Sequence, residues 1–294
     1  MASYLAMALT TNYWRPGTHY LKEIVSAIAG KVSNGDLIVI SEKAISTAMG
    51  RIVDESLFKP SLSAKLIARI WMPIVWGYIL GPLCRMQRIL IERLRRYPRE
   101  EGSRHKQVAI QYAGLMQALM FGSEGGIDGS NLPYSYVSLP LQNADAIAER
   151  IRMEIKRKLG KNVAVMIVDT DSTFSFRGFH FTYRPKPIKG IYSSKTFLAY
   201  VLGRMFKMRR RATPIALKGC RLQVEEALRI AEFANKVRGS GAGKTVWDMV
   251  ESYNVGLTDV TWEMLEKSRH KPIVIVRKKR GTTLHSSSPQ LILL

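Results

Sequence analysis

The sequence predicts a mixed α+β protein, because compact apolar runs alternate along its 294 residues with amphipathic helical segments. Three runs are typical of buried strands: LIVIS at 37–41, NVAVMIVDTD at 162–171 and KPIVIVRKK at 271–279. Residues at 20–32, 144–159 and 225–237 have helical spacing instead. With 46% hydrophobic residues the chain can bury a sizeable core, so we expect one domain over 1–280 and a flexible tail over 281–294.

Helical spacing over 20–32 places Leu21, Ile24, Val25 and Ile28 on one side, and the turn signal NGD separates this helix from the strand at 37–41. A helix is predicted over 107–120 and a short strand within YSYVSLPL. The helix at 225–237 ends at the glycines of RGSGAGKT.

The most apolar window, LIARIWMPIVWGYILGPLC at 66–84, is not expected to span a membrane. It contains Arg69, two prolines and two glycines, whereas a spanning helix needs about 20 predominantly apolar residues. A buried helical hairpin or a dimer-interface element is the favoured interpretation. Surface anchoring to a membrane stays open, because a basic stretch follows at 85–99.

The formal net charge of +22 favours anionic partners, which include nucleic acid, an acidic membrane and polyanionic small molecules. Arginines and lysines cluster at 93–99, 209–211 and 277–280. The two cysteines, Cys84 and Cys220, have no metal-binding spacing, and the N-terminal residues do not resemble a signal peptide. These features predict a cytoplasmic protein.

The stretch EGGIDGSNLP at 124–133 places one carboxylate, Asp128, among glycines. Glycines allow a close approach of the backbone to a ligand, and a carboxylate there can hold a cation beside a phosphate. The same residue types also form ordinary turns, so this segment alone favours a turn.

VMIVDTD is the most informative pattern, because an apolar strand delivers Asp169, Thr170 and Asp171 at its carboxyl end. Their oxygens suit Mg²⁺ or Mn²⁺ held together with nucleotide phosphates. An acid at a strand end that only caps the next turn is the alternative.

RGSGAGKT at 238–245 resembles a P-loop but does not match one. Gly239 and Gly243 enclose three residues where the motif needs four, and the segment follows a predicted helix where a P-loop follows a strand. Its backbone N–H groups can still contact a phosphate. The five histidines are scattered, so acids, glycine loops and positive charge remain, which are the components of metal-assisted phosphoryl chemistry.

Together these segments resemble the GTP-dependent γ-glutamyl ligases that elongate the deazaflavin coenzyme F-420. GDLIVISEKAISTAMGR resembles the family's early strand and SKAEGR-like segment, EGGIDGSN its AGIDxSN motif, and GKNVAVMIVDTDSTFSFRG its GK-apolar-TDTxGRxxRRG motif. The resemblance covers roughly residues 9–280, with a diverged, helical and apolar part at about 58–120 and a second diverged part at 239–270.

The resemblance implies roles for particular residues. Asp128, Asp169 and Thr170 would bind divalent cations, with Asp171 as a possible further ligand. Asn131, Lys43 and the glycine loop at Gly239, Ser240 and Gly241 would contact GTP, and Arg177 and Gly178 the substrate. GTP and Mg²⁺ or Mn²⁺ would activate the carboxylate of F-420-0 or a similar anionic acceptor as an acyl phosphate, and L-glutamate would displace the phosphate. An archaeal or actinobacterial homodimer is implied as well.

The sequence departs from the family pattern at several positions. Ser240 stands where the family has an acidic metal ligand, and Thr47 and Met49 replace the lysine and glutamate of SKAEGR, which leaves Lys43 as a substitute cation. Two alternatives therefore stay open. One is an inactive homologue that binds nucleotide or F-420, and the other is a basic nucleic-acid-binding protein, although no nucleic-acid module is visible.

Overall fold

The computed structural model describes residues 3–279 and 292–293, and its centre is one mixed sheet. The strand order is β10-β1-β9-β2-β5-β6-β7, and β8 pairs with the other edge of β5. The bounds are β1 Tyr4–Thr11, β2 Leu37–Ser41, β5 Ala164–Phe176, β6 Phe179–Thr182, β7 Tyr192–Ser193, β8 Arg209–Lys218, β9 His270–Lys278 and β10 Ile292–Leu293. The α+β fold class is confirmed.

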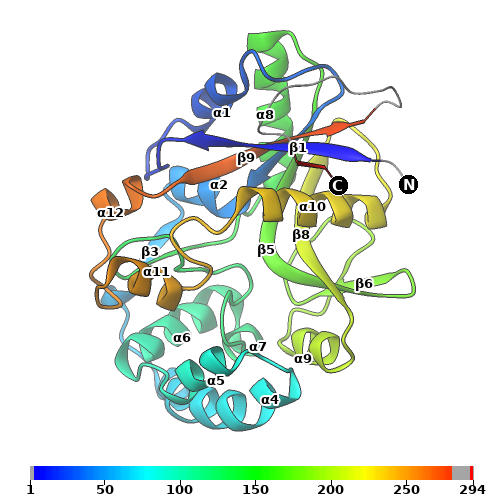
Figure 1. Ribbon diagram of the computed structural model, residues 1–294. Helices are drawn as coiled ribbons and strands as arrows, with labels where there is room; N and C mark the ends of the chain where they lie inside the picture. Colours follow the sequence, from blue (N-terminus) through cyan, green and yellow to red (C-terminus); the bar gives the residue numbers. More distant parts are fainter. Residues whose placement is uncertain (1–2, 280–291, 294) are drawn as a thin grey trace.

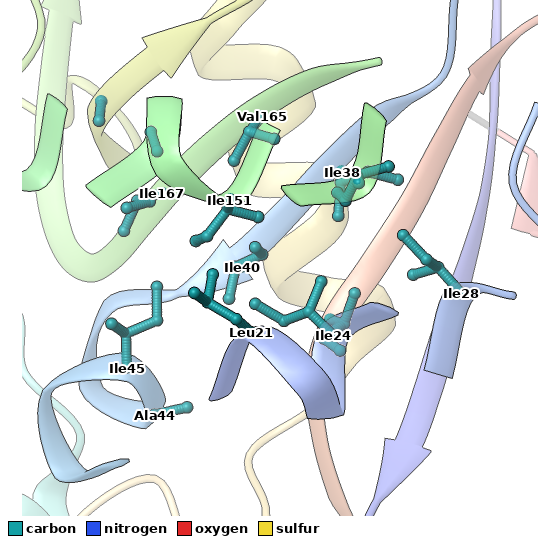
Figure 2. Close-up of a cluster of buried hydrophobic side chains, with 14 of the residues drawn as sticks. Leu21, Ile24, Ile28, Ile38, Ile40, Ala44, Ile45, Ile151, Val165 and Ile167 are labelled. Carbon is teal, nitrogen blue, oxygen red and sulfur yellow. The ribbon is translucent and has the colours of Figure 1, made fainter. Parts of the chain in front are cut away.

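Helices cover both faces of this sheet. Alternate residues of β2 face opposite sides, so Ile38 and Ile40 pack with α1 (Tyr20–Ile28), α2 (Glu42–Ala48) and α8 (Ala144–Leu159). Figure 2 shows Leu21, Ile24 and Ile28 of α1 in this cluster. Leu37 and Val39 pack on the other side with α10 (Val224–Arg238).

A second group of helices lies at one end of the molecule, away from α1 and α8 (Figure 1). It packs around Trp76, Phe174 and Tyr200, which belong to a separate buried cluster. Its members are η1 Glu55–Leu57, α3 Leu62–Leu66, η2 Ile67–Leu80, α4 Gly81–Leu83, α5 Arg88–Arg95, α6 Glu100–Ala113, α7 Leu115–Ala118 and α9 Leu198–Met205. The remaining elements are β3 Ile52–Asp54, β4 Tyr136–Ser138, α11 Val246–Tyr253 and α12 Trp262–Glu266.

The apolar window does not form the buried hairpin favoured above. The segments α3, η2 and α4 run as one helix, Leu62–Leu83, which we call the apolar helix. By length and composition it is the one helix among the described residues that could cross a membrane, with a mean hydropathy of 1.4. Only 33% of its most apolar window is buried inside the protein, so most of the helix is not covered by other elements. One face packs inward through Met72 and Trp76, while large aliphatic residues stay exposed on the other.

Most other predicted elements are found with shifted ends. The strand at 37–41 and the helix at 144–159 match as predicted, and the helix at 20–32 ends earlier, at Ile28. The strand at 162–171 instead runs five residues further, to Phe176, because its second half pairs with β6 in a hairpin. Most of the tail predicted at 281–294 lies outside the described residues.

Candidate functional site

Asp169 and Thr170 lie where the pairing of β5 with its neighbouring strands is interrupted. The parallel pairing of β2 with β5 ends at Ser41 opposite Val168, and the pairing of β6 with β5 starts at Thr173. On the other edge, the register with β8 shifts between Asp169 and Ser172. Asp169 and Thr170 therefore lie just beyond the carboxyl end of β2, where ligands bind in open α/β sheets.

One guanidinium, that of Arg184, pairs with two carboxylates, the partly buried Asp169 and the buried Glu42. Arg184 donates from Nε to Asp169, and its NH2 group donates to both oxygens of Glu42, at 2.6 and 2.8 Å. Glu42 is the first residue of α2, directly after β2. Burial alone would lower the pKa of Arg184, but the two carboxylates outweigh it and raise the pKa, so the guanidinium stays charged.

Lys43 connects α2 to the loop that contains Asp128. Its ammonium pairs with the Asp128 carboxylate and donates to the backbone oxygen and the hydroxyl of Ser130, at 2.9 and 2.6 Å. The second Asp128 oxygen accepts from the Ser130 N–H at 2.7 Å. A backbone pairing between Asp128 and Ser138 holds this loop against β4.

Asn131 fixes the glycine loop that follows α10. Its Nδ2 donates to the backbone oxygens of Ser240 and Gly243, at 3.2 and 2.9 Å, and its Oδ1 accepts from the N–H of Ala242 at 2.6 Å. A Cβ on Gly241 would lie 2.5 Å from that oxygen, so the loop requires glycine there. Asn131 therefore holds the position of the glycine loop.

A cavity of about 640 Å³ lies beside these groups, and we call it the cation-lined cavity. Among the predicted residues its wall contains Lys43, Asn131, Asp169, Thr170, Gly239, Ser240 and Gly241. Eight basic residues face two acids, Asp169 and Glu232; the basic residues are Lys43, Arg210, Arg211, Lys236, Arg238, Lys244, Arg269 and Lys271. Such an excess of positive charge suits a polyanionic ligand.

A second cavity of about 630 Å³ adjoins the first, and we call it the aromatic cavity. Its wall includes Asp128 and many aromatic side chains, which are Tyr97, Phe121, Tyr134, Tyr136, Tyr183, Tyr200 and Trp247. Both cavities share Thr170, Ser172, Arg210 and Lys244 in their walls. The two cavities are therefore neighbours that have this wall in common.

The structure does not bring every predicted residue to these cavities. Asp171 is buried outside both cavity walls, and burial, together with Asp169, raises the pKa of its carboxyl well above the usual range. Its carboxyl therefore faces neither cavity, whereas Asp128 and Asp169 each line one. Arg177 and Gly178 form the exposed turn between β5 and β6 and line neither cavity.

The described carboxylates do not fit a site that holds Mg²⁺ or Mn²⁺ by protein ligands alone. Asp128 is paired with Lys43, and Asp169 with Arg184. Within residues 3–279 and 292–293, no three His, Cys, Asp or Glu side chains are grouped as metal ligands. The positive charge beside these carboxylates comes from the chain itself.

Sequence reasoning missed Arg184, Glu42, Arg210 and Lys244. Arg184 follows β6 and contacts Glu42, 142 positions away, so only the fold reveals the pair. The arginine cluster at 209–211 was noted for charge, but its position at the shared wall depends on the pairing of β8 with β5.

Comparisons with known proteins place the chain among related sequences. A family model described as F420-0:Gamma-glutamyl ligase matches residues 8–197. The chain is 36% identical over 286 residues to an uncharacterized protein of Methanocaldococcus jannaschii, covering 93% of this chain and 96% of the relative. It is 31% identical over 162 residues to the coenzyme F420:L-glutamate ligase of Archaeoglobus fulgidus, covering 54% of this chain and 56% of that enzyme.

Proposed function

Since the chain belongs to the F420-0:gamma-glutamyl ligase family, we propose that it forms an amide bond between L-glutamate and coenzyme F-420-0 or a related anionic acceptor. GTP would supply the energy, and the protein would act in the cytoplasm as a homodimer. The observation that supports this proposal is the shared wall between the two cavities.

Each cavity suits one reactant. The cation-lined cavity, with eight basic residues and the glycine loop, suits the triphosphate of GTP. The aromatic cavity suits the planar ring of a deazaflavin, because aromatic side chains stack on such rings. Arg204 and Arg210 in its wall provide positive charge for the acceptor's anionic groups.

The proposed reaction has two steps. A carboxylate oxygen of the acceptor attacks the γ-phosphorus of GTP, the bond to the bridging oxygen breaks, and GDP leaves. The amine of L-glutamate then attacks the acyl carbon, phosphate leaves, and the amine loses a proton to solvent. Arg210 and Lys244, at the shared wall, would stabilise the phosphoryl oxygens during transfer.

Mg²⁺ or Mn²⁺ enters this proposal only as the counter-ion of the nucleotide phosphates. Mg²⁺ is commonly bound through substrate phosphates rather than in a cage of protein ligands alone. Lys43 and Arg184 would then orient Asp128 and Asp169 instead of leaving both free for metal.

Thermal-shift titration with GTP and ATP, each with and without Mn²⁺, tests the nucleotide site. A nucleotide at a hundred times its dissociation constant should stabilise the protein by about 2.7 kcal/mol. We expect a rise in Tm with GTP, a loss of that rise in Lys244→Ala, and no rise with Mn²⁺ alone. Lys158→Ala, an exposed change on α8, is the matched control. Absence of any nucleotide shift would contradict the proposal and favour an inactive homologue that binds F-420 alone or a nucleic-acid-binding protein.

A further inference from the structure

The apolar helix exposes a continuous line of large side chains. Leu62, Leu66, Ile70, Ile74 and Tyr78 follow one another at four-residue spacing, which places them along one side of the helix. Each is between 48% and 74% exposed. Ile79 and Leu83 continue the exposed line to the end of the helix.

Neighbouring helices carry further exposed apolar residues. In α9 and just after it, Leu198, Leu202 and Phe206 are exposed at the same four-residue spacing. Arg204 of α9 donates to the backbone oxygens of Cys84 and Arg85, at 3.1 and 3.0 Å, so α9 lies against the end of the apolar helix. Contiguous apolar surface of this kind marks an interaction site.

The chain segment that contains the apolar helix and α5 is strongly basic. Residues 59–99 contain nine lysines and arginines and one acid, Glu92, which pairs with Arg88. Seven of the basic residues from the apolar helix onward are exposed; they are Lys65, Arg69, Arg85, Arg88, Arg95, Arg96 and Arg99. A second copy of the chain would bring the same positive charge to such an interface, so this surface does not favour self-association.

The apolar helix is also unsuited to crossing a bilayer in this fold. Ile67, Met72 and Trp76 are buried against the protein, and Trp71 and Trp76 donate to the backbone oxygen of Leu119 at 2.8 and 2.7 Å. Only the outward face is available to lipid. A helix with one apolar face and basic flanks is typical of proteins that lie in the membrane interface.

We propose that the outward face of the apolar helix, together with its basic flanks, binds the surface of an anionic lipid membrane. Ile70 and Ile74 would enter the acyl boundary, and arginines 85–99 would lie at the lipid headgroups. Near an anionic surface each Lys or Arg contributes attraction that falls with salt.

Co-sedimentation of the full chain with two kinds of vesicle tests this proposal. One kind is phosphatidylcholine alone and the other contains about 30% phosphatidylglycerol, as an anionic surface. We expect binding to the anionic vesicles only, with a decrease at high salt. Ile70→Ser/Ile74→Ser should weaken binding by about tenfold or more, as should Arg85→Glu/Arg88→Glu.

The matched control is Met153→Ser, which changes an apolar residue of α8 that is 50% exposed and distant in sequence from this surface. It should bind the vesicles like the unchanged protein, and circular dichroism should show that all variants are folded. Failure to bind either vesicle, or equal and salt-insensitive binding to both, would overturn the proposal. So would light scattering in which Ile70→Ser/Ile74→Ser converts a dimer to a monomer, since a second copy would then cover this face.

Discussion

Asn131 Oδ1 accepts a 2.6 Å hydrogen bond from the backbone N–H of Ala242, which joins the Asp128 loop to the glycine loop. Asn131→Ala removes this bond and two more to Ser240 and Gly243. At about 0.5–1.5 kcal/mol for each of the three bonds, we expect GTP affinity to fall by about tenfold to a thousandfold. Calorimetric titration measures this change. Asn143→Ala, at a helix cap without a side-chain cap bond, should leave the affinity unchanged.

Gly241 tests the same contact from the other side. Gly241 and Gly160 have similar φ angles, 63° and 65°, so alanine strains the backbone equally at both positions. Only at Gly241 would the new Cβ meet Asn131. We expect Gly241→Ala to weaken GTP binding and Gly160→Ala to cost about 1 kcal/mol of stability without affecting GTP binding. Equal effects on binding would argue against this role of the contact.

Arg184 is the cationic partner of two carboxylates, the buried Glu42 and the partly buried Asp169. Arg184→Met leaves Glu42 and Asp169 unpaired, and we expect a loss of about 3–5 kcal/mol in the free energy of unfolding. Urea denaturation measures this loss. Glu42→Gln/Arg184→Met should be less destabilised than the single change, because one unpaired charge is removed. A double variant that is less stable than Arg184→Met would refute the coupling.

His105 makes stability depend on pH in the alkaline range. It contacts Glu55 at 2.6 Å and Glu124 at 2.9 Å. Burial alone would lower the pKa of His105, but these carboxylates raise it from 6.5 to about 10. The raised pKa adds stability that is fully present below pH 6.5 and is lost as pH rises toward 10.

We therefore expect the free energy of unfolding of the wild type to fall by a few kcal/mol, on the order of the energy that corresponds to the pKa shift, between pH 7 and 10. The Tm of His105→Gln should fall less over that range. Parallel curves for the two proteins would show that His105 does not carry the effect.

Much of the fold could be predicted from the sequence, because buried strands and amphipathic helices leave a local pattern. The strand LIVIS and the helix at 144–159 have such a pattern, and both were predicted with the bounds that the structure shows. The strand β8 was missed because RRRATPIALK begins with three arginines, and it is held as a strand by pairing with β5. The apolar helix was predicted to be buried because composition alone does not reveal which face another element covers.

Only those parts of the candidate site that leave a local sequence pattern could be predicted. The motifs identified Asp128, Asp169 and the glycine loop, which the fold brings to the two cavities. The cationic partners of these acids, Lys43 and Arg184, come from other elements. Their pairing depends on where β2 ends beside β5, and no local pattern records that.

One labelling experiment tests the central claim, which is amide formation through an acyl phosphate at the shared wall of the cavities. F-420-0 carrying ¹⁸O in its carboxylate would be incubated with GTP, L-glutamate and the protein, and the products analysed by mass spectrometry. We predict a glutamyl product and transfer of one ¹⁸O into the released phosphate, with both lost in Lys244→Ala and retained in Lys158→Ala. A glutamyl product whose phosphate contains no ¹⁸O would contradict the mechanism, and absence of the product would contradict the proposed activity.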